Sequence, residues 1–383
     1  MSNPLVNRVL LCYKHEIYKL FQTTDIRIEF GLPMRKSLIA IFKSIVCLTL
    51  LILYSTTIWA EEKKNKTFDT FTFYWENDFF AGTDRDYTNG FKFTWSTPYL
   101  TNREESRLPG WSYPVLNFLP LVKDPTSSRA ISTSLGQNIF TAEDTDVEEL
   151  IVDQRPYAGY LYLAFGFHSK KENRKDTWEI ALGVVGPTSL AKQTQNLVHD
   201  ITGSDRAEGW DNQIDDEPTI EVICESKWRL LHSELGRGFR YDFIPHLGGG
   251  VGNVAIYANT GAELRFGWNL PENFGSCPIR PGCETGAVFG IPQDTTFPRS
   301  RFSIHLFTGV DGMAVLHNIF LDGNNFRDSH SVDKKNFVAD LMAGLVLSYG
   351  RYMCSYSYVY RTKEYKTQKD PQVFGSIQFS FSY

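Results

Sequence analysis

Hydrophobic and polar side chains alternate along many short stretches between about residue 69 and the end of the chain. In the first stretch, Phe71, Phe73 and Trp75 alternate with mostly polar residues. In the second, the same alternation places Tyr87 on one face with Phe91 and the following aromatic residues. A period of two residues is typical of a β-strand whose two faces meet different surroundings.

The pattern predicts about twelve strands, each near ten residues long, which is the length of a tilted strand that crosses a bilayer. The predicted strands are 69–77, 87–97, 130–140, 157–167, 176–186, 219–231, 239–250, 255–268, 301–311, 336–348, 350–361 and 372–383. One face is crowded with aromatic residues and the other carries charged and hydroxyl side chains. The sequence therefore predicts an all-β protein, a transmembrane antiparallel β-barrel that is apolar outside and polar inside.

The N-terminal part has the pattern of a secretory signal. A basic stretch precedes the apolar run 44–54, which is too short to span a bilayer and therefore disfavours a retained membrane anchor. We expect cleavage after Ala60, with residues 1–60 as an N-terminal extension and signal, Met34 as an alternative start, and residues 61–383 as the barrel. A signal followed by a closed barrel predicts the bacterial outer membrane.

Composition excludes a nucleic-acid binder that acts through bulk charge, because 39 basic and 44 acidic residues give a net charge of −5. Cys224 and Cys354 fall inside predicted strands, whereas Cys277 and Cys283 share one loop and could pair in an oxidising compartment. With an even strand number both termini are periplasmic. Odd-to-even connections then face outward, and the two long connections, 98–129 and 269–300, are periplasmic.

The outward connection after the first strand carries a polar group at its base. Asp78 continues the polar face of that strand, and Asp86 and Thr88 share the polar face at the start of the next. Gathered oxygen ligands of this kind suit a hard cation such as Ca²⁺. The alternative is a solvated hairpin tip, since Asp, Asn and Gly are ordinary turn residues.

The outward connection 187–218 contains a predicted helix. Thr188 or Ser189 offers an N-cap and Gly203 a C-terminal stop. Gln195 and His199 are four residues apart. They lie opposite an apolar stripe at helical spacing, formed by Leu190, Thr194, Leu197 and Ile201. We expect the helix to dock by the apolar stripe and to present His199 toward the barrel mouth. The alternative is that His199 is one exposed loop histidine among eight in the chain.

Several motifs in this order resemble one known family. They are Asn77-Asp78, Asp86-Tyr87-Thr88 followed by Gly90, Gly186-Pro187, Gln195-Asn196-x-x-His199, and Trp210-x-x-Gln213-Ile214. Together they resemble the outer-membrane lipid A 3′-O-deacylases, a calcium-dependent family of twelve-stranded barrels. The resemblance covers most of residues 68–383, and its specificity rests on the blocks 77–90 and 183–214.

The resemblance implies an esterase that removes the 3′-linked acyloxyacyl chain of lipid A, with its site toward the outer leaflet and lipopolysaccharide as substrate. We expect the protein to be a monomer. It implies His199 as the general base, and a Ca²⁺ ion that stabilises the oxyanion. The implied catalytic positions are His199, Asn77, Thr88 and Gln195, and the implied metal ligands are Asp78, Asp205 and Asp86. Asp205 stands where the family pattern can carry a glutamate. The family's phosphate-binding pair has no counterpart, which leaves Arg155 and Arg206 as candidates.

Two other functions remain open at this point. A non-catalytic barrel, such as a small channel or an adhesin, could use the same scaffold with different loops. Inward charges such as Glu76, Lys92 and Glu179 would close such a channel if they formed ion pairs. An outer-membrane phospholipase would need a Ser/His pair. Ser189 is ten residues from His199, nearly three turns away on a single helix.

Overall fold

The computed structural model describes residues 67–78, 87–101, 105–275 and 302–383, all within the unit Ala60–Tyr383. The predicted signal, Asp86, and the loop cysteines Cys277 and Cys283 lie outside the described residues. Within them, no helix is both long and apolar enough to cross a membrane.

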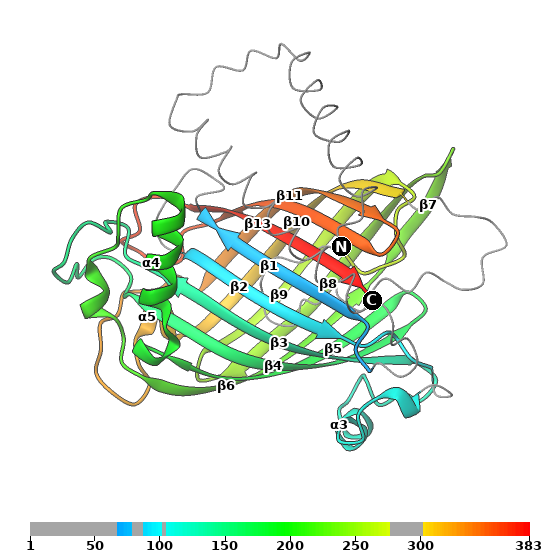
Figure 1. Cartoon of the computed structure of the whole chain (residues 1–383), viewed down its shortest axis with the longest axis horizontal. Helices are drawn as coiled ribbons and strands as arrows, with labels where there is room; N and C mark the ends of the chain where they lie inside the picture. Colours follow the sequence, from blue (N-terminus) through cyan, green and yellow to red (C-terminus); the bar gives the residue numbers. More distant parts are fainter. Residues whose placement is uncertain (1–66, 79–86, 102–104, 276–301) are drawn as a thin grey trace, which may run out of the picture. The chain divides into compact units, whose positions relative to one another are not determined.

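Antiparallel strands form one closed sheet (Figure 1). The strands are β1 (Thr70–Asn77), β2 (Tyr87–Ser96), β3 (Ser128–Phe140), β4 (Ala158–Lys171), β5 (Arg174–Val185), β6 (Glu217–Trp228), β7 (Leu230–Gly236), β8 (Phe239–Gly252), β9 (Ala255–Trp268), β10 (Phe302–Asn318), β11 (Phe337–Tyr349), β12 (Tyr352–Arg361) and β13 (Gln372–Ser382). Apart from β6 and β7, which do not pair with each other, each strand pairs with its neighbours in the chain, so the order is a simple meander.

The sheet closes into a barrel at two places. β1 pairs with β13 along its whole length, from Thr70 opposite Ser382 to Asn77 opposite Gly375. β6 and β7 pair with successive parts of β8 and act as one strand interrupted at Arg229. The barrel therefore has twelve strands, as predicted. The boundaries differ by a few residues, most at β10, which continues to Asn318 where the prediction ended it at 311.

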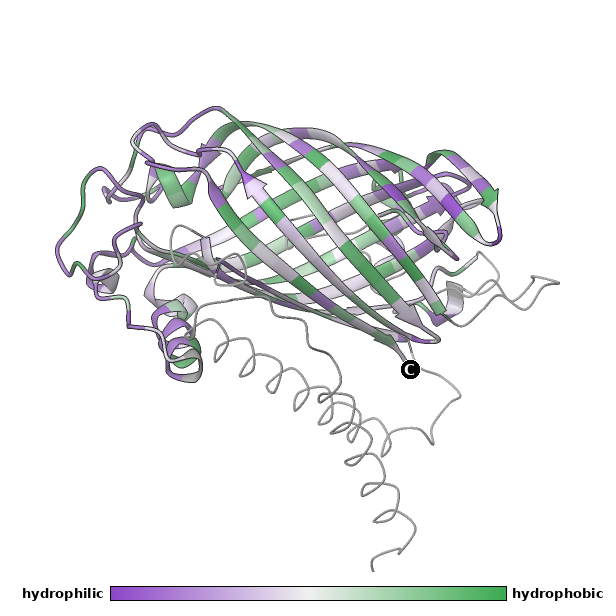
Figure 2. Ribbon diagram, turned by 90° about the horizontal axis from the view of Figure 1, so that it is seen from above, coloured by the Kyte–Doolittle hydropathy of each residue, from purple (hydrophilic) through white to green (hydrophobic). Residues whose placement is uncertain are grey.

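The two faces of the wall differ as the alternation predicts, and hydrophobic and hydrophilic residues alternate along the strands in Figure 2. Outward aromatic side chains stack across β1 and β2, where the ring centroids of Phe73 and Phe93 lie 5.1 Å apart and those of Trp75 and Phe91 5.9 Å apart. Leu306 on β10 is 59% exposed on the same outer face. Such a surface is suited to contact with lipid.

The inner face holds buried charges in ion pairs. Lys92 Nζ lies 3.9 Å from a carboxylate oxygen of Glu179, and both side chains are almost fully buried. Arg265 donates two hydrogen bonds to the carboxylate of Asp242, at 2.8 and 2.6 Å, and a third to Asn273. Charges buried in this way are stable only when they are paired. They fill the lumen and argue against an open channel.

A short helix fills the barrel mouth at one end. α5 (Ile319–Asp322) follows β10 and places Phe320 against Phe140, with ring centroids 4.2 Å apart. Burial raises the pKa of Asp322, but hydrogen bonds from His317 and Lys334 outweigh it and lower the pKa to about 2. The carboxylate of Asp322 therefore stays charged and anchors α5 over the lumen.

The long connection between β2 and β3 is a real elaboration, at the opposite end from α5 (Figure 1). It contains η2 (Glu105–Arg107) and α3 (Ser112–Phe118), and Leu116 of α3 packs on the outer side of Ile131 and Phe167. The apolar cluster covers the outside of β3 and β4.

We predict that Arg265→Met destabilises the barrel by about 3–5 kcal/mol, because it leaves the Asp242 carboxylate buried without its bidentate partner. The measurement is the urea midpoint of unfolding in detergent. The double variant Arg265→Met with Asp242→Leu serves as the control and should recover much of the loss. Equal destabilisation in the single and double variants would contradict the ion-pair explanation.

Candidate functional site

A row of four residues crosses the outer wall near the end of the barrel that α5 closes. Register pairs Asn77 of β1 with Asn89 of β2, Asn89 with Ile139 of β3, and Ile139 with Gly159 of β4. The row shares the outward face of Trp75, whose Nε1 donates a hydrogen bond to Asn89 Oδ1 at 3.1 Å. All four residues are buried despite facing outward, so other parts of the chain cover them.

The cover over the far end of this row is α4 (Ala191–Thr202), which follows η3 (Pro187–Ser189) in the β5–β6 connection. A Cβ atom at Gly159 would collide with Ser189 Oγ and Ala191 Cβ, so only glycine lets the helix approach the wall this closely. Ala191 also packs in a cluster with Ile139. α4 is therefore anchored on β4 and β3.

The buried face of α4 points across the strands toward β2 and β1. Ala191, Gln195 and His199 are four residues apart and are all buried. The helix rises about 12 Å from Ala191 to His199, which spans two to three strand spacings of about 4.8 Å. The helix contacts β4 and β3, and a helix of this length that begins over β4 is long enough to reach the strands that carry the asparagines. In Figure 1, α4 lies across this end of the sheet.

The predicted helix is confirmed, but the prediction of its docking face is wrong. Leu190 and Leu197 of the apolar stripe are 52% and 60% exposed, whereas Gln195 and His199 are 1% and 4% exposed. The outer wall is the lipid-facing side of the barrel, so an outward apolar stripe continues that surface.

The N-cap prediction is also wrong. Leu190, in the left-handed conformation, occupies the cap position. The Thr188 side chain bonds to Asp216 instead, and Ser189 Oγ donates to the Gly186 carbonyl. The predicted stop at Gly203 is confirmed, with φ of 77°.

A β-bulge at Thr88 reorganises the start of β2. The register with β3 shifts between Tyr87 and Asn89, so Thr88 is the extra residue. The bulge turns Tyr87 into the lumen against Phe140, which corrects the prediction that Tyr87 shares the lipid face of Phe91. Thr88 Oγ1 lies 2.7 Å from Thr141 Oγ1, and both are buried. Bulges of this kind re-aim side chains beside functional sites.

The imidazole of His199 is held by backbone. Its Nδ1 bonds to the carbonyl oxygen of Asp205, beyond the end of the helix. A carbonyl only accepts, so Nδ1 donates this bond, and in the neutral ring Nε2 is the basic nitrogen. The contribution of Asp205 to this bond is its main chain, and its side chain is exposed.

Gln195 is oriented by a residue to which sequence reasoning gave no role. Trp210, in η4 (Gly209–Asn212), is fully buried, stacks edge-on against Tyr157 and donates from Nε1 to Gln195 Oε1 at 2.7 Å. The bond fixes the amide so that its Nε2 is the free donor. Nε2 is buried and has no hydrogen-bond partner in the described structure. The sequence did contain an indication that Trp210 matters, because Trp210 begins the Trp210-x-x-Gln213-Ile214 block of the family resemblance.

The oxygen groups expected to bind a cation lie at the other end of the row. Asn77 is the last residue of β1, and Asp78 follows it with its side chain 1% exposed. Asp86 lies outside the described residues. Among those that are described, no three His, Cys, Asp or Glu side chains form a metal-binding group. That absence concerns His, Cys, Asp and Glu only. The amide oxygen of Asn77 and the hydroxyl of Thr88 are oxygen ligands of other residue types.

The two arginine candidates each form an ion pair. Arg155 is buried and donates to Glu364 at 3.1 Å, and Arg206 pairs with Asp200 at the surface. The buried hydroxyl of Ser189 is bonded to its own turn and does not meet His199, so the Ser/His pair of a phospholipase is not formed.

Comparison with known proteins decides the family. The sequence model of a family described as outer membrane protein LpxR matches residues 45–383. This chain belongs to the LpxR family. The structure of LpxR from Salmonella typhimurium superposes on this LpxR-family barrel with a TM-score of 0.65 and 18% identity, over 82% of this chain and 100% of that one. At that identity the likeness shows a shared fold. The protein is thus an outer-membrane barrel.

Other solved barrels are more remote. The β domain of the Bordetella autotransporter BrkA matches with a TM-score of 0.41 and 9% identity, over 83% of this LpxR-family chain and 100% of the domain. No curated protein sequence matches this chain.

We predict that Gly159→Val displaces α4 from the wall and leaves the barrel intact, because the added side chain collides with Ser189 and Ala191. Limited proteolysis of the folded protein should then cleave within 187–203 at least about tenfold faster than in the parent. Gly110→Val is the matched control, since a Cβ at Gly110 has open space around it. Unchanged protection of 187–203 in Gly159→Val would show that this contact does not anchor the helix.

Proposed function

We propose that this protein is a lipid A 3′-O-deacylase, a calcium-dependent ester hydrolase that removes the 3′-linked acyloxyacyl chain from lipid A in the outer leaflet. The observation that carries the proposal is the pairing on α4, where a buried histidine held at Nδ1 by the Asp205 carbonyl and a buried amide donor lie on the same face of the helix. Membership of the LpxR family supports the same role.

In the proposed reaction His199 Nε2 takes a proton from water, whose oxygen attacks the ester carbonyl. The bond between the acyl carbon and the 3′ oxygen of the sugar then breaks, and the protonated ring returns its proton to that leaving oxygen, which gives a hydroxyl and a free carboxylic acid. The bond from Nδ1 to the Asp205 carbonyl keeps the ring in the tautomer that this step requires. The free N–H of Gln195 donates to the oxygen on which negative charge develops, and Trp210 keeps the amide in that orientation. Asn77 and Thr88 line the wall opposite the helix.

The residues at the end of β1 fit a calcium ion. Asp78 offers a buried carboxylate, Asn77 an amide oxygen and Thr88 a hydroxyl, and an all-oxygen set of this kind suits Ca²⁺. Asp86 and Asp205 remain further proposed ligands. The bound ion would supply stabilisation of the oxyanion.

The surroundings of α4 support a lipid substrate. Leu190 and Leu197 point away from the barrel and extend its apolar outer surface at this rim. The site therefore lies between a lipid-facing helix and a lipid-facing wall, beside the acyl chains of a membrane lipid. A channel is disfavoured by the buried ion pairs and by Phe320 in the mouth.

We expect His199→Ala to lower the deacylation rate by at least about 10²-fold, the usual contribution of a general base. Mass spectrometry of lipid A from cells that express each variant measures the reaction, with Ca²⁺ present or chelated. His330→Ala is the matched control, because that ring also bonds to a backbone carbonyl, that of Gln154. Full deacylation by His199→Ala would exclude it as the base. Lipid A unchanged by the wild type would favour a non-catalytic barrel.

We expect Trp210→Phe to lower kcat about tenfold with little effect on KM, since one orienting hydrogen bond is lost and the aromatic packing is kept. The measurement is the rate on purified lipid A at saturating substrate. Trp268→Phe is the control, as its Nε1 bonds to the Arg237 carbonyl away from α4. A loss confined to folding yield would mean that Trp210 acts in stability alone.

A further inference from the structure

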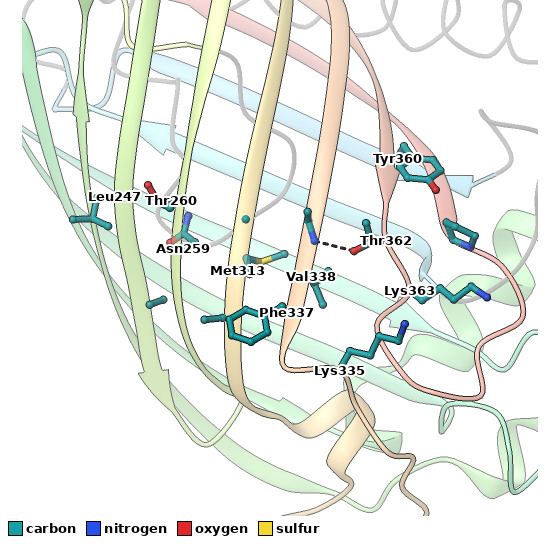
Figure 3. A pocket seen from close by; sticks show the side chains of 15 residues that line it. Leu247, Asn259, Thr260, Met313, Lys335, Phe337, Val338, Tyr360, Thr362 and Lys363 are labelled. Atoms are coloured by element: carbon teal, nitrogen blue, oxygen red, sulfur yellow. Dashed lines mark hydrogen bonds between the residues drawn. The ribbon is translucent and has the colours of Figure 1, made fainter.

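An apolar groove lies on the outer wall of the barrel, opposite α4. It has a volume of about 780 Å³ and crosses β8 to β12 (Figure 3). In the circular strand order, β10 and β11 are about six strands from β3 and β4, which is half the circumference of twelve. The β12 edge of the groove is two strands from β1, and the residues that line the groove include none of the candidate site.

Small residues make the groove. Its floor is formed by the outward positions Ala258, Gly312, Ala314 and Ala339. Larger side chains rise at its edges, with Leu247 57% exposed on β8 and Tyr360 37% exposed on β12. A strip of small residues between bulky ones on a lipid-facing wall leaves room for an extended hydrocarbon chain.

A second groove of about 610 Å³ adjoins the first. The two share Ala314, Lys335 and Phe337. Phe337 is 80% exposed and forms a ridge between them. Two grooves on either side of one ridge can hold two chains that meet at a single headgroup.

Positive charge gathers where the grooves reach the end of the strands. Lys335 and Lys363 line the loop end of the first groove, as Figure 3 shows. Lys363 Nζ donates to the Lys369 carbonyl at 2.7 Å, and the exposed ammonium of Lys335 bonds to no side chain of the described residues. Neither lysine is paired with a carboxylate in this part of the structure. By contrast, Lys366 is neutralised by Asp333 at 3.1 Å.

We propose that these grooves form a second, non-catalytic lipid site, which holds a phosphate-bearing lipid with at least two acyl chains. The chains lie in the grooves beside Phe337, and the phosphate lies between Lys335 and Lys363. Charge complementarity selects this occupant, because two unneutralised lysines at the end of an apolar groove match an anionic headgroup above its chains. An uncharged lipid or an apolar protein face would leave both ammonium groups without a negatively charged partner.

The test counts bound lipid by native mass spectrometry of the full chain in detergent. His199→Ala is the parent, so that the added probe, diphosphorylated lipid A, is not cleaved. We expect the parent to retain one more lipid than a variant in which Ala314→Trp fills both grooves. The double variant Lys335→Glu and Lys363→Glu should bind that lipid at least about tenfold more weakly. Dephosphorylated lipid A should not occupy the site in the parent.

Two matched controls should retain the parent's lipid count. Ala343→Trp adds the same bulk at an outward position of the neighbouring strand β11. Lys123→Glu reverses an exposed charge away from the groove. The proposal fails if the groove-filling variant and the charge-reversal variant both keep the parent's count, or if Ala314→Trp abolishes a dimer of the chain and no lipid adduct. Because the readout is binding by an inactive parent, it is independent of whether the chain deacylates lipid A.

Discussion

The whole structure depends on one constraint, that no backbone N–H or C=O can face hydrocarbon without a partner. Pairing β1 with β13 and β6 with β8 satisfies it by closing the sheet. Closure leaves every side chain either inside or outside. A polar side chain that faces outward needs a hydrogen-bond partner or a cover, and Asn77 and Asn89 at the rim are buried. A site beneath a covering helix is one way in which a closed wall can keep polar chemistry on its outer surface.

The cover over these residues is α4, and it depends on a close approach of the helix to the wall. Gly159 lets the start of α4 lie against β4, and the helix then runs across the strands. The helix has reversed its expected amphipathic sense, with Gln195 and His199 turned to the wall and Leu197 turned outward. Its polar side meets the polar row, and its apolar side meets the surroundings of the barrel. The arrangement is consistent with the proposed action on a lipid.

Sequence periodicity predicted the fold well because lipid imposes a strict two-residue alternation, which Phe71, Phe73 and Trp75 follow. It failed where the chain departs from that rule. Tyr87 is on the unexpected face because the bulge at Thr88 adds one residue, and a single inserted residue reverses every facing before it. The face of α4 was misread because packing in water buries leucines, whereas an outer wall in a membrane exposes them. Gln195 and His199 were found by spacing, but their partners Trp210 and the Asp205 carbonyl come from a separate loop that no helical period can place.

The position of Phe320 in the barrel mouth has a consequence for the route by which reaction products leave. Phe320 stacks on Phe140 at the mouth and charged pairs occupy the inside of the barrel, an arrangement that disfavours passage along the barrel axis. Under the proposed reaction, the fatty acid and the shortened lipid are both released on the side from which the substrate came. The enzyme would then alter the composition of a single leaflet and leave the permeability of the membrane to solutes unchanged. The barrel would then serve to hold the site in the membrane at the level of its substrate.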